Sequence, residues 1–193
     1  MDANILEMIT HHVDSCFEKD TPGYLLYHNI SHTHQVVDRS KEISDFYKIA
    51  DSQKFILLAA AWFHDLGFLY ATPQLHETTS VSLMENYLNP YCPEEILNEI
   101  GNTILSTKFP THPNNFLESI ICDADSYHFG TEQFFITDEL VRKEMEARTG
   151  INFKDWKQHS LNLLKSHQFY TLYCQENLNA GKEKNISILE SQL

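Results

Sequence analysis

The chain has 193 residues, of which 42% are hydrophobic and 12% aromatic, and it carries a formal net charge of −13. This length and composition suit one globular domain over residues 1–193 with a substantial core. The excess of acidic residues argues against nucleic acid or an anionic membrane surface as a partner, because both bind basic proteins. The sequence has no apolar run of membrane-spanning length, no signal-peptide pattern at its start and no Cys-x-x-Cys motif among its four cysteines, so we expect a cytoplasmic protein with reduced thiols.

Hydrophobic residues recur at helical spacing along nearly the whole chain, and no segment alternates as a strand would. Asn29 or Ser31 is the expected cap of the second helix, and Gly67 is the expected stop of the third. The pattern predicts an all-α fold, a compact single-domain helical bundle with short connections. Residues 182–193 are expected to be helical or frayed. The other predicted helices cover approximately residues 4–18, 30–49, 52–66, 73–88, 93–107, 116–122, 131–149, 152–167 and 169–179.

The pair His64-Asp65 directly follows the most apolar stretch of the chain, residues 55–63. A charged carboxylate is expensive to bury unless a partner compensates it, and an acid is disfavoured at the negative end of a helix dipole. A divalent metal ion is the obvious partner, because neutral imidazole and ionised carboxylate are both metal ligands. The alternative, a capping histidine beside a solvated aspartate, leaves the acid uncompensated. We therefore expect His64 and Asp65 to bind a metal ion.

Two distant segments offer further ligands. His28 and His32 lie about one turn apart at the start of the second predicted helix, where free backbone amides also favour anions. Asp123 and Asp125 follow another apolar run. We expect His32 and Asp125 to complete a set of four metal ligands, and His28 to face a bound phosphate. Asp123 is expected to support a ligand through a hydrogen bond or to cap the next turn.

Three more residues are candidates for contacts with a metal ion, a water molecule or a phosphate. His76 could bind a second metal ion, and Glu77 could orient or deprotonate water. An exposed first-turn acid beside a polar histidine is an equally open interpretation of this pair. Lys108 precedes a polar loop and could contact a phosphate, although a solvated surface charge is the simpler interpretation of a single lysine.

Together these residues resemble the HD-domain superfamily of metal-dependent phosphohydrolases, whose signature is a histidine, then a His-Asp pair, then a distant aspartate. The likeness is greatest to small bacterial proteins identified as HD phosphohydrolases, and it covers about residues 27–178. The matching motifs are Tyr27-His28-Asn29-x-x-His32, Trp62-Phe63-His64-Asp65, Glu77-Thr78-Thr79-Ser80, and Asp123-Ala124-Asp125 followed by Gly130.

The resemblance implies a metal-dependent hydrolase that cleaves phosphoric esters or anhydrides in a small phosphorylated substrate, which in many members of the family is a nucleotide. By similarity to cyclic-nucleotide phosphodiesterases it implies His28 as the general acid, with Asp65 or Glu77 taking the proton of water. It implies one divalent ion, of manganese, iron, zinc, nickel, cobalt or magnesium. Two-metal members add a histidine in the segment around His76 and further histidines in the next helix; residues 104–108 of this chain contain none, although His112 follows in the loop. Two alternatives stay open, a diiron oxygenase of the HD type and a catalytically inactive module that binds a nucleotide or a partner.

Overall fold

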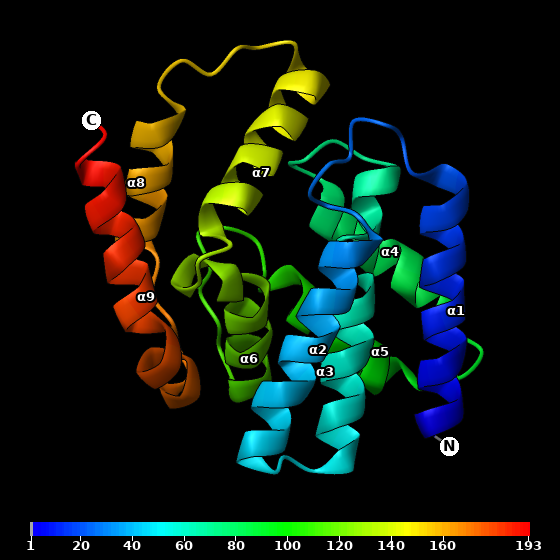
Figure 1. Cartoon of the computed structure of the whole chain (residues 1–193). Coiled ribbons are helices and arrows are strands. Elements are labelled where there is room, and N and C mark those ends of the chain that lie inside the picture. The colour runs from blue at the N-terminus through cyan, green and yellow to red at the C-terminus, as the bar shows by residue number, and fades with distance from the viewer. Residues whose placement is uncertain (1) are drawn as a thin grey trace. The chain divides into compact units, whose positions relative to one another are not determined.

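Figure 1 shows the computed structural model, which describes residues 2–193, with side chains from residue 4 onward. Every regular element in this range is a helix, so the all-α prediction is confirmed. Contacts divide the chain into two compact units: residues up to Pro22 with His28–Asp125, and Gly23–Tyr27 with Ser126–Leu193. Met1, at which the expected domain begins, lies outside the described residues. None of the described helices is long and apolar enough to cross a membrane.

The first unit packs its helices around α3, Asp51–Phe63, which contacts α1, α2, α4, α5 and α6. A helix that is apolar nearly all round belongs at the centre of a bundle, and Leu57, Ala60 and Phe63 of α3 are fully buried. Burial of a large apolar side chain contributes about 1.5–3 kcal/mol. In Figure 1, α2 runs beside α3. The bounds of the other elements are Asp2–Asp20 (α1), Ile30–Tyr47 (α2), Leu66–Leu69 (the 3₁₀ helix η1), His76–Leu88 (α4), Glu94–Leu105 (α5) and Phe116–Asp125 (α6).

Helix α2 begins where the sequence predicts. The side chain of Asn29 accepts hydrogen bonds from the backbone N–H groups of Ser31 and His32, at 2.9 and 3.4 Å. Asn29 is therefore the N-cap, and it satisfies two of the backbone donors that a helix start leaves unpaired. This cap places His32 in the first turn of α2, with its ring pointing into the unit, where only 5% of the residue is exposed.

The C-terminal end of α2 has one residue, Lys48, in a strained backbone conformation, and this strain leads to a prediction about stability. Lys48, the C-cap, has φ 53° and ψ 44°, in the left-handed region. A side chain costs about 1 kcal/mol in that region, whereas glycine adopts it freely. Lys48→Gly is therefore expected to raise the free energy of unfolding by about 1 kcal/mol, as measured by urea denaturation. Lys41→Gly, on the exposed face of the same helix, is the matched control and should lower that free energy by a similar amount. Equal effects of the two changes would contradict the prediction.

The connection from α3 to α4 differs from the prediction and positions two histidines. Helix α3 ends at Phe63, and Gly67 lies within η1, so the prediction that Gly67 stops α3 is wrong. Glycine is needed there for another reason: a Cβ atom would lie 2.0 Å from the carbonyl oxygen of His76. Ser80 secures this contact, because its hydroxyl donates to the carbonyl of His64 at 2.7 Å and accepts from the N–H of Gly67 at 2.8 Å. The start of α4 is thereby held against the end of α3.

The second unit ends in a helix that is longer than predicted. The sequence predicts a helix end near residue 179, but α9 is continuous through Gly181. A Cβ atom on Gly181 would lie 1.9 Å from the carbonyl oxygen of Gly130, so this glycine permits close packing on η2 and does not break the helix. Asn185, one turn later, donates to the carbonyl oxygen of Phe129 at 3.0 Å. The elements of this unit are η2 (Tyr127–Gly130), α7 (Phe134–Thr149), α8 (Trp156–Ser166) and α9 (Leu172–Glu190).

Candidate metal centre

Three helix termini of the first unit bring two imidazoles and a carboxylate together. His32 lies in the first turn of α2, His64 directly follows α3, and Asp125 is the last residue of α6. Nε2 of His32 lies 3.0 Å from Oδ1 of Asp125, and Nε2 of His64 lies 3.8 Å from the same oxygen. The ligand atoms of the three residues all lie within 4.8 Å of one another, so this group could hold a metal ion.

Asp65 adds a second carboxylate to this ligand group. Its Oδ2 atom lies 3.4 Å from Nε2 of His32 and 3.3 Å from Nε2 of His64. Nε2 of His64 and Oδ2 of Asp65 are buried, and neither has a hydrogen-bond partner among the described residues. Buried polar atoms are rarely left without a partner, so these two point to a bound ligand. A divalent cation fits them, because it accepts electron pairs from imidazole nitrogen and carboxylate oxygen alike.

Hydrogen bonds at Nδ1 orient the histidines on either side of Asp65. Nδ1 of His64 lies 2.8 Å from the carbonyl oxygen of Ala61, and Nδ1 of His76 lies 2.6 Å from that of Pro73. A carbonyl oxygen only accepts, so each ring donates from Nδ1 and keeps Nε2 as the atom that can bind a metal ion. Nε2 of His76 lies 3.5 Å from Oδ1 of Asp65. His76 therefore faces the other oxygen of the same carboxylate.

The electrostatics of the ligand group favour positive charge. Burial by itself lowers the pKa of His64, but the carboxylates of Asp65 and Asp125 outweigh it and raise this pKa to about 9. Burial raises the pKa of both carboxyl groups, but His64 beside Asp65, and His32 beside Asp125, outweigh it and hold both pKa values below the usual range. A divalent cation bound between these side chains would compensate the negative charge of the two carboxylates, as a proton on an imidazole does.

Glu77 lies beside the ligand group and not on an exposed face of α4. Only 4% of Glu77 is exposed, and its Oε2 atom lies 3.4 Å from Nδ1 of His76 with no hydrogen-bond partner. The interpretation of Glu77 as an exposed first-turn acid is therefore wrong.

Within the range that the structure covers, His32, His64 and Asp125 form the one group of three or more close metal-binding side chains.

A cavity of about 500 Å³ opens beside the ligand group, a volume typical of small-molecule sites. Asp65 and Asp125 line it together with His28, Glu77 and Lys108. Lys108 is the one lysine or arginine on this wall; it is exposed, and its ammonium has no hydrogen bond or ion pair with the described residues. The wall of this cavity thus contains both carboxylates that can hold a cation and a lysine that can contact an anion. We call it the metal-site cavity.

Phe68, which sequence reasoning missed, holds two histidines of this cavity. Its ring stacks on that of His28, with centroids 4.0 Å apart and planes at 16°, and on that of His76, at 3.9 Å and 26°. Two rings stacked this closely lie on opposite faces of Phe68, because one face has room for only one of them. An aromatic residue after Gly67 predicts core packing and nothing more specific, so no signal in the sequence marks this role.

Asp123 is not a member of the group of close metal-binding side chains. It is fully buried in α6 and does not line the metal-site cavity. Two residues along a helix correspond to a rotation of about 200°, so Asp123 and Asp125 point to nearly opposite sides of α6. Of the two aspartates, Asp125 is the one whose carboxylate joins His32 and His64 in the group that could hold a metal ion.

Comparison with known proteins adds no relative to this description. No protein-family model matches the chain, and no curated protein or solved structure matches it. The likeness to HD phosphohydrolases is thus carried by the motif residues alone.

Proposed function

We propose that this protein is a metal-dependent phosphohydrolase that cleaves an ester or anhydride bond in a small phosphorylated substrate. The observation that carries the proposal is the meeting of two imidazoles and two carboxylates at the wall of a cavity of substrate size. His32, His64, Asp65 and Asp125 would hold one divalent ion, and their nitrogen and oxygen donors suit manganese, iron, zinc, nickel, cobalt or magnesium.

The metal-site cavity offers the charges that a phosphate needs. A bound divalent ion lowers the pKa of a coordinated water and offsets negative charge on phosphoryl oxygens. In a chain with a net charge of −13, an anionic substrate also needs local positive charge from the protein. Lys108 is the residue that can supply it, because it lines this cavity and its ammonium pairs with no carboxylate among the described residues. We assign Lys108 to binding the phosphate.

Two further residues are placed for proton transfer. Glu77 lines the cavity, and its buried Oε2 atom has no hydrogen-bond partner among the described residues, so this carboxylate can take a proton from the attacking water. We favour Glu77 over Asp65 for this role, because Asp65 has one oxygen among the ligand group and the other near His76. His28 lines the same cavity, and we assign it the protonation of the leaving oxygen.

The purified full chain tests the proposal directly. After removal of metal and reloading with each of the six divalent ions, we expect about one ion per chain by elemental analysis and phosphate release that depends on the ion. A panel of phosphate monoesters, diesters and anhydrides covers the substrate classes. Bound metal without phosphate release from any of them would favour the inactive regulatory module. Oxygen uptake by the iron form without phosphate release would favour the diiron oxygenase.

A further inference from the structure

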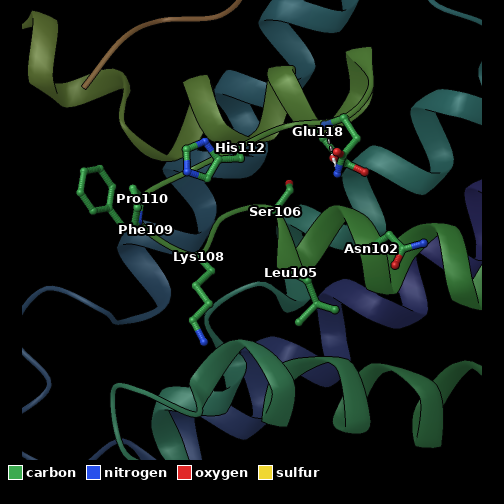
Figure 2. A pocket seen from close by; sticks show the side chains of 9 residues that line it. Asn102, Leu105, Ser106, Lys108, Phe109, Pro110, His112 and Glu118 are labelled. Atoms are coloured by element: carbon green, nitrogen blue, oxygen red, sulfur yellow. Dashed lines mark hydrogen bonds between the residues drawn. The ribbon is translucent and has the colours of Figure 1, made fainter. Parts of the chain in front are cut away.

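A second cavity, of about 650 Å³, adjoins the metal-site cavity. It lies between the end of α5, residues 106–115 and the start of α6, and we call it the loop cavity (Figure 2). Lys108 and Phe109 line both cavities. A substrate whose phosphate lies beside Asp65 and Lys108 can therefore extend past Phe109 into the loop cavity.

The loop cavity presents little charge to a ligand. Its one acidic residue is Glu118, whose carboxylate accepts hydrogen bonds from the backbone N–H and side-chain amide of Asn114, at 2.6 and 3.2 Å, and from the side-chain amide of Asn115, at 2.8 Å. Its one lysine, Lys108, extends away from Glu118 and His112 in Figure 2. A buried carboxylate that is held by three donors is a structural group, so the space suits an uncharged ligand better than a second anionic one.

The remaining side chains suit a flat ring with polar edges. Phe109 is 48% exposed and Leu105 39% exposed, so both keep apolar surface free for a ligand. Asn102 and His112 add an amide and an imidazole to the same wall, and the structure gives neither the ring of His112 nor the amide of Asn102 a hydrogen bond among the described residues. An aromatic face with nearby hydrogen-bonding groups is the usual wall of a pocket for an aromatic or heteroaromatic ring.

We propose that the loop cavity binds the organic part of the substrate, and that this part is a flat, uncharged ring that stacks on Phe109. The proposal rests on the proposed function, because it assigns the phosphate of the same molecule to the metal-site cavity. It defines the substrate class as phosphate compounds in which a ring follows the phosphate, with Phe109 as the residue that selects for the ring.

Non-hydrolysable phosphonates separate ring binding from turnover. Phenylphosphonate and methylphosphonate carry the same anionic group, and their dissociation constants for the manganese-loaded full chain can be measured by calorimetry. We expect phenylphosphonate to bind about tenfold more tightly, since an aromatic contact of this kind contributes that order of affinity. Cyclohexylphosphonate, which is similar in size but not flat, should bind more weakly than phenylphosphonate.

Variants of Phe109 test whether this residue is the one that causes the preference for phenylphosphonate. Phe109→Ala is expected to weaken phenylphosphonate about tenfold and methylphosphonate much less, so that the preference for the ring is lost, and Phe109→Tyr should keep the preference. Phe116→Ala is the matched control, because Phe116 is 45% exposed and does not line the loop cavity. Equal binding of the phosphonates by the wild-type protein, binding of none of them, or equal losses in Phe109→Ala and Phe116→Ala would overturn the proposal.

A parallel assay keeps this test distinct from that of the proposed function. Glycerol phosphate carries no ring, so its hydrolysis reports on the metal centre alone. Hydrolysis of glycerol phosphate together with equal binding of the phosphonates would overturn the ring subsite and leave the hydrolase in place. A preference for phenylphosphonate in a protein that hydrolyses no phosphate compound would support the subsite and overturn the hydrolase.

Discussion

Asp65→Asn is expected to remove most of the divalent metal from the purified protein. Asparagine keeps the size of the side chain but removes a negative charge that lies 3.4 and 3.3 Å from the two imidazole nitrogens of the ligand group. Loss of hydrogen-bonding support alone weakens metal sites by about 10–100-fold, and we expect loss of a ligand charge to exceed about 100-fold in the dissociation constant. Elemental analysis and competition with a chelator measure the change. Phosphate release should fall with the metal content.

His64→Ala should act in the same direction, and His34→Ala is the control for both. His34 is an exposed histidine on α2 whose Nε2 atom lies 2.9 Å from Asp14, away from the cavity. Because His64 is fully buried, its removal also leaves a void, so the thermal unfolding of each variant must be compared. Equal metal contents in the wild-type protein, Asp65→Asn and His64→Ala would remove the basis for the metal centre.

His28→Ala is expected to keep the metal ion and to lose turnover. His28 lines the metal-site cavity but lies outside the ligand group, so its removal leaves in place the four side chains proposed to hold the ion. General acid catalysis contributes about 10²–10⁴-fold, so kcat for an alkyl phosphate should fall by that factor. Metal content, measured as for Asp65→Asn, should stay at the wild-type level.

The choice of leaving group separates an acid from a residue that only supports the fold. An alkoxide needs a proton to depart, whereas the 4-nitrophenolate ion does not. The loss of kcat in His28→Ala should therefore be large for glycerol phosphate and small for 4-nitrophenyl phosphate. Equal losses on the two substrates, or unchanged turnover on both, would reject the assignment of His28 as the acid.

The parts of this site that the sequence predicts are those with a local cause. The cap at Asn29 depends on a side chain that reaches two or three residues along the chain, and it fixes where His32 stands. The long apolar run before His64 specifies a central helix, so a charged residue at its end had to meet a compensating group. Local patterns of this kind lead to His32, His64 and Asp125, which the structure brings together.

The features that the sequence does not predict depend on contacts between distant segments. Gly67 and Gly181 are typical of helix ends by local rules, yet each lies where a backbone carbonyl from another segment comes within 2.0 Å of the position of a Cβ atom. The depth at which Glu77 is buried depends on how α4 packs, since its neighbours in sequence are polar. No single stretch of sequence contains such information, because the partner residues lie elsewhere in the chain.

The ring of Phe68 restricts the movement of both His28 and His76, because both imidazoles pack against it. Because both imidazoles are stacked on it at about van der Waals distance, neither can turn far about its side-chain bonds unless Phe68 gives way. A movement of the His76 ring therefore changes the packing of the His28 ring as well. Under the proposed function, the histidine assigned as the proton donor is thus packed, through one hydrocarbon ring, against a histidine that faces a carboxylate of the candidate metal centre.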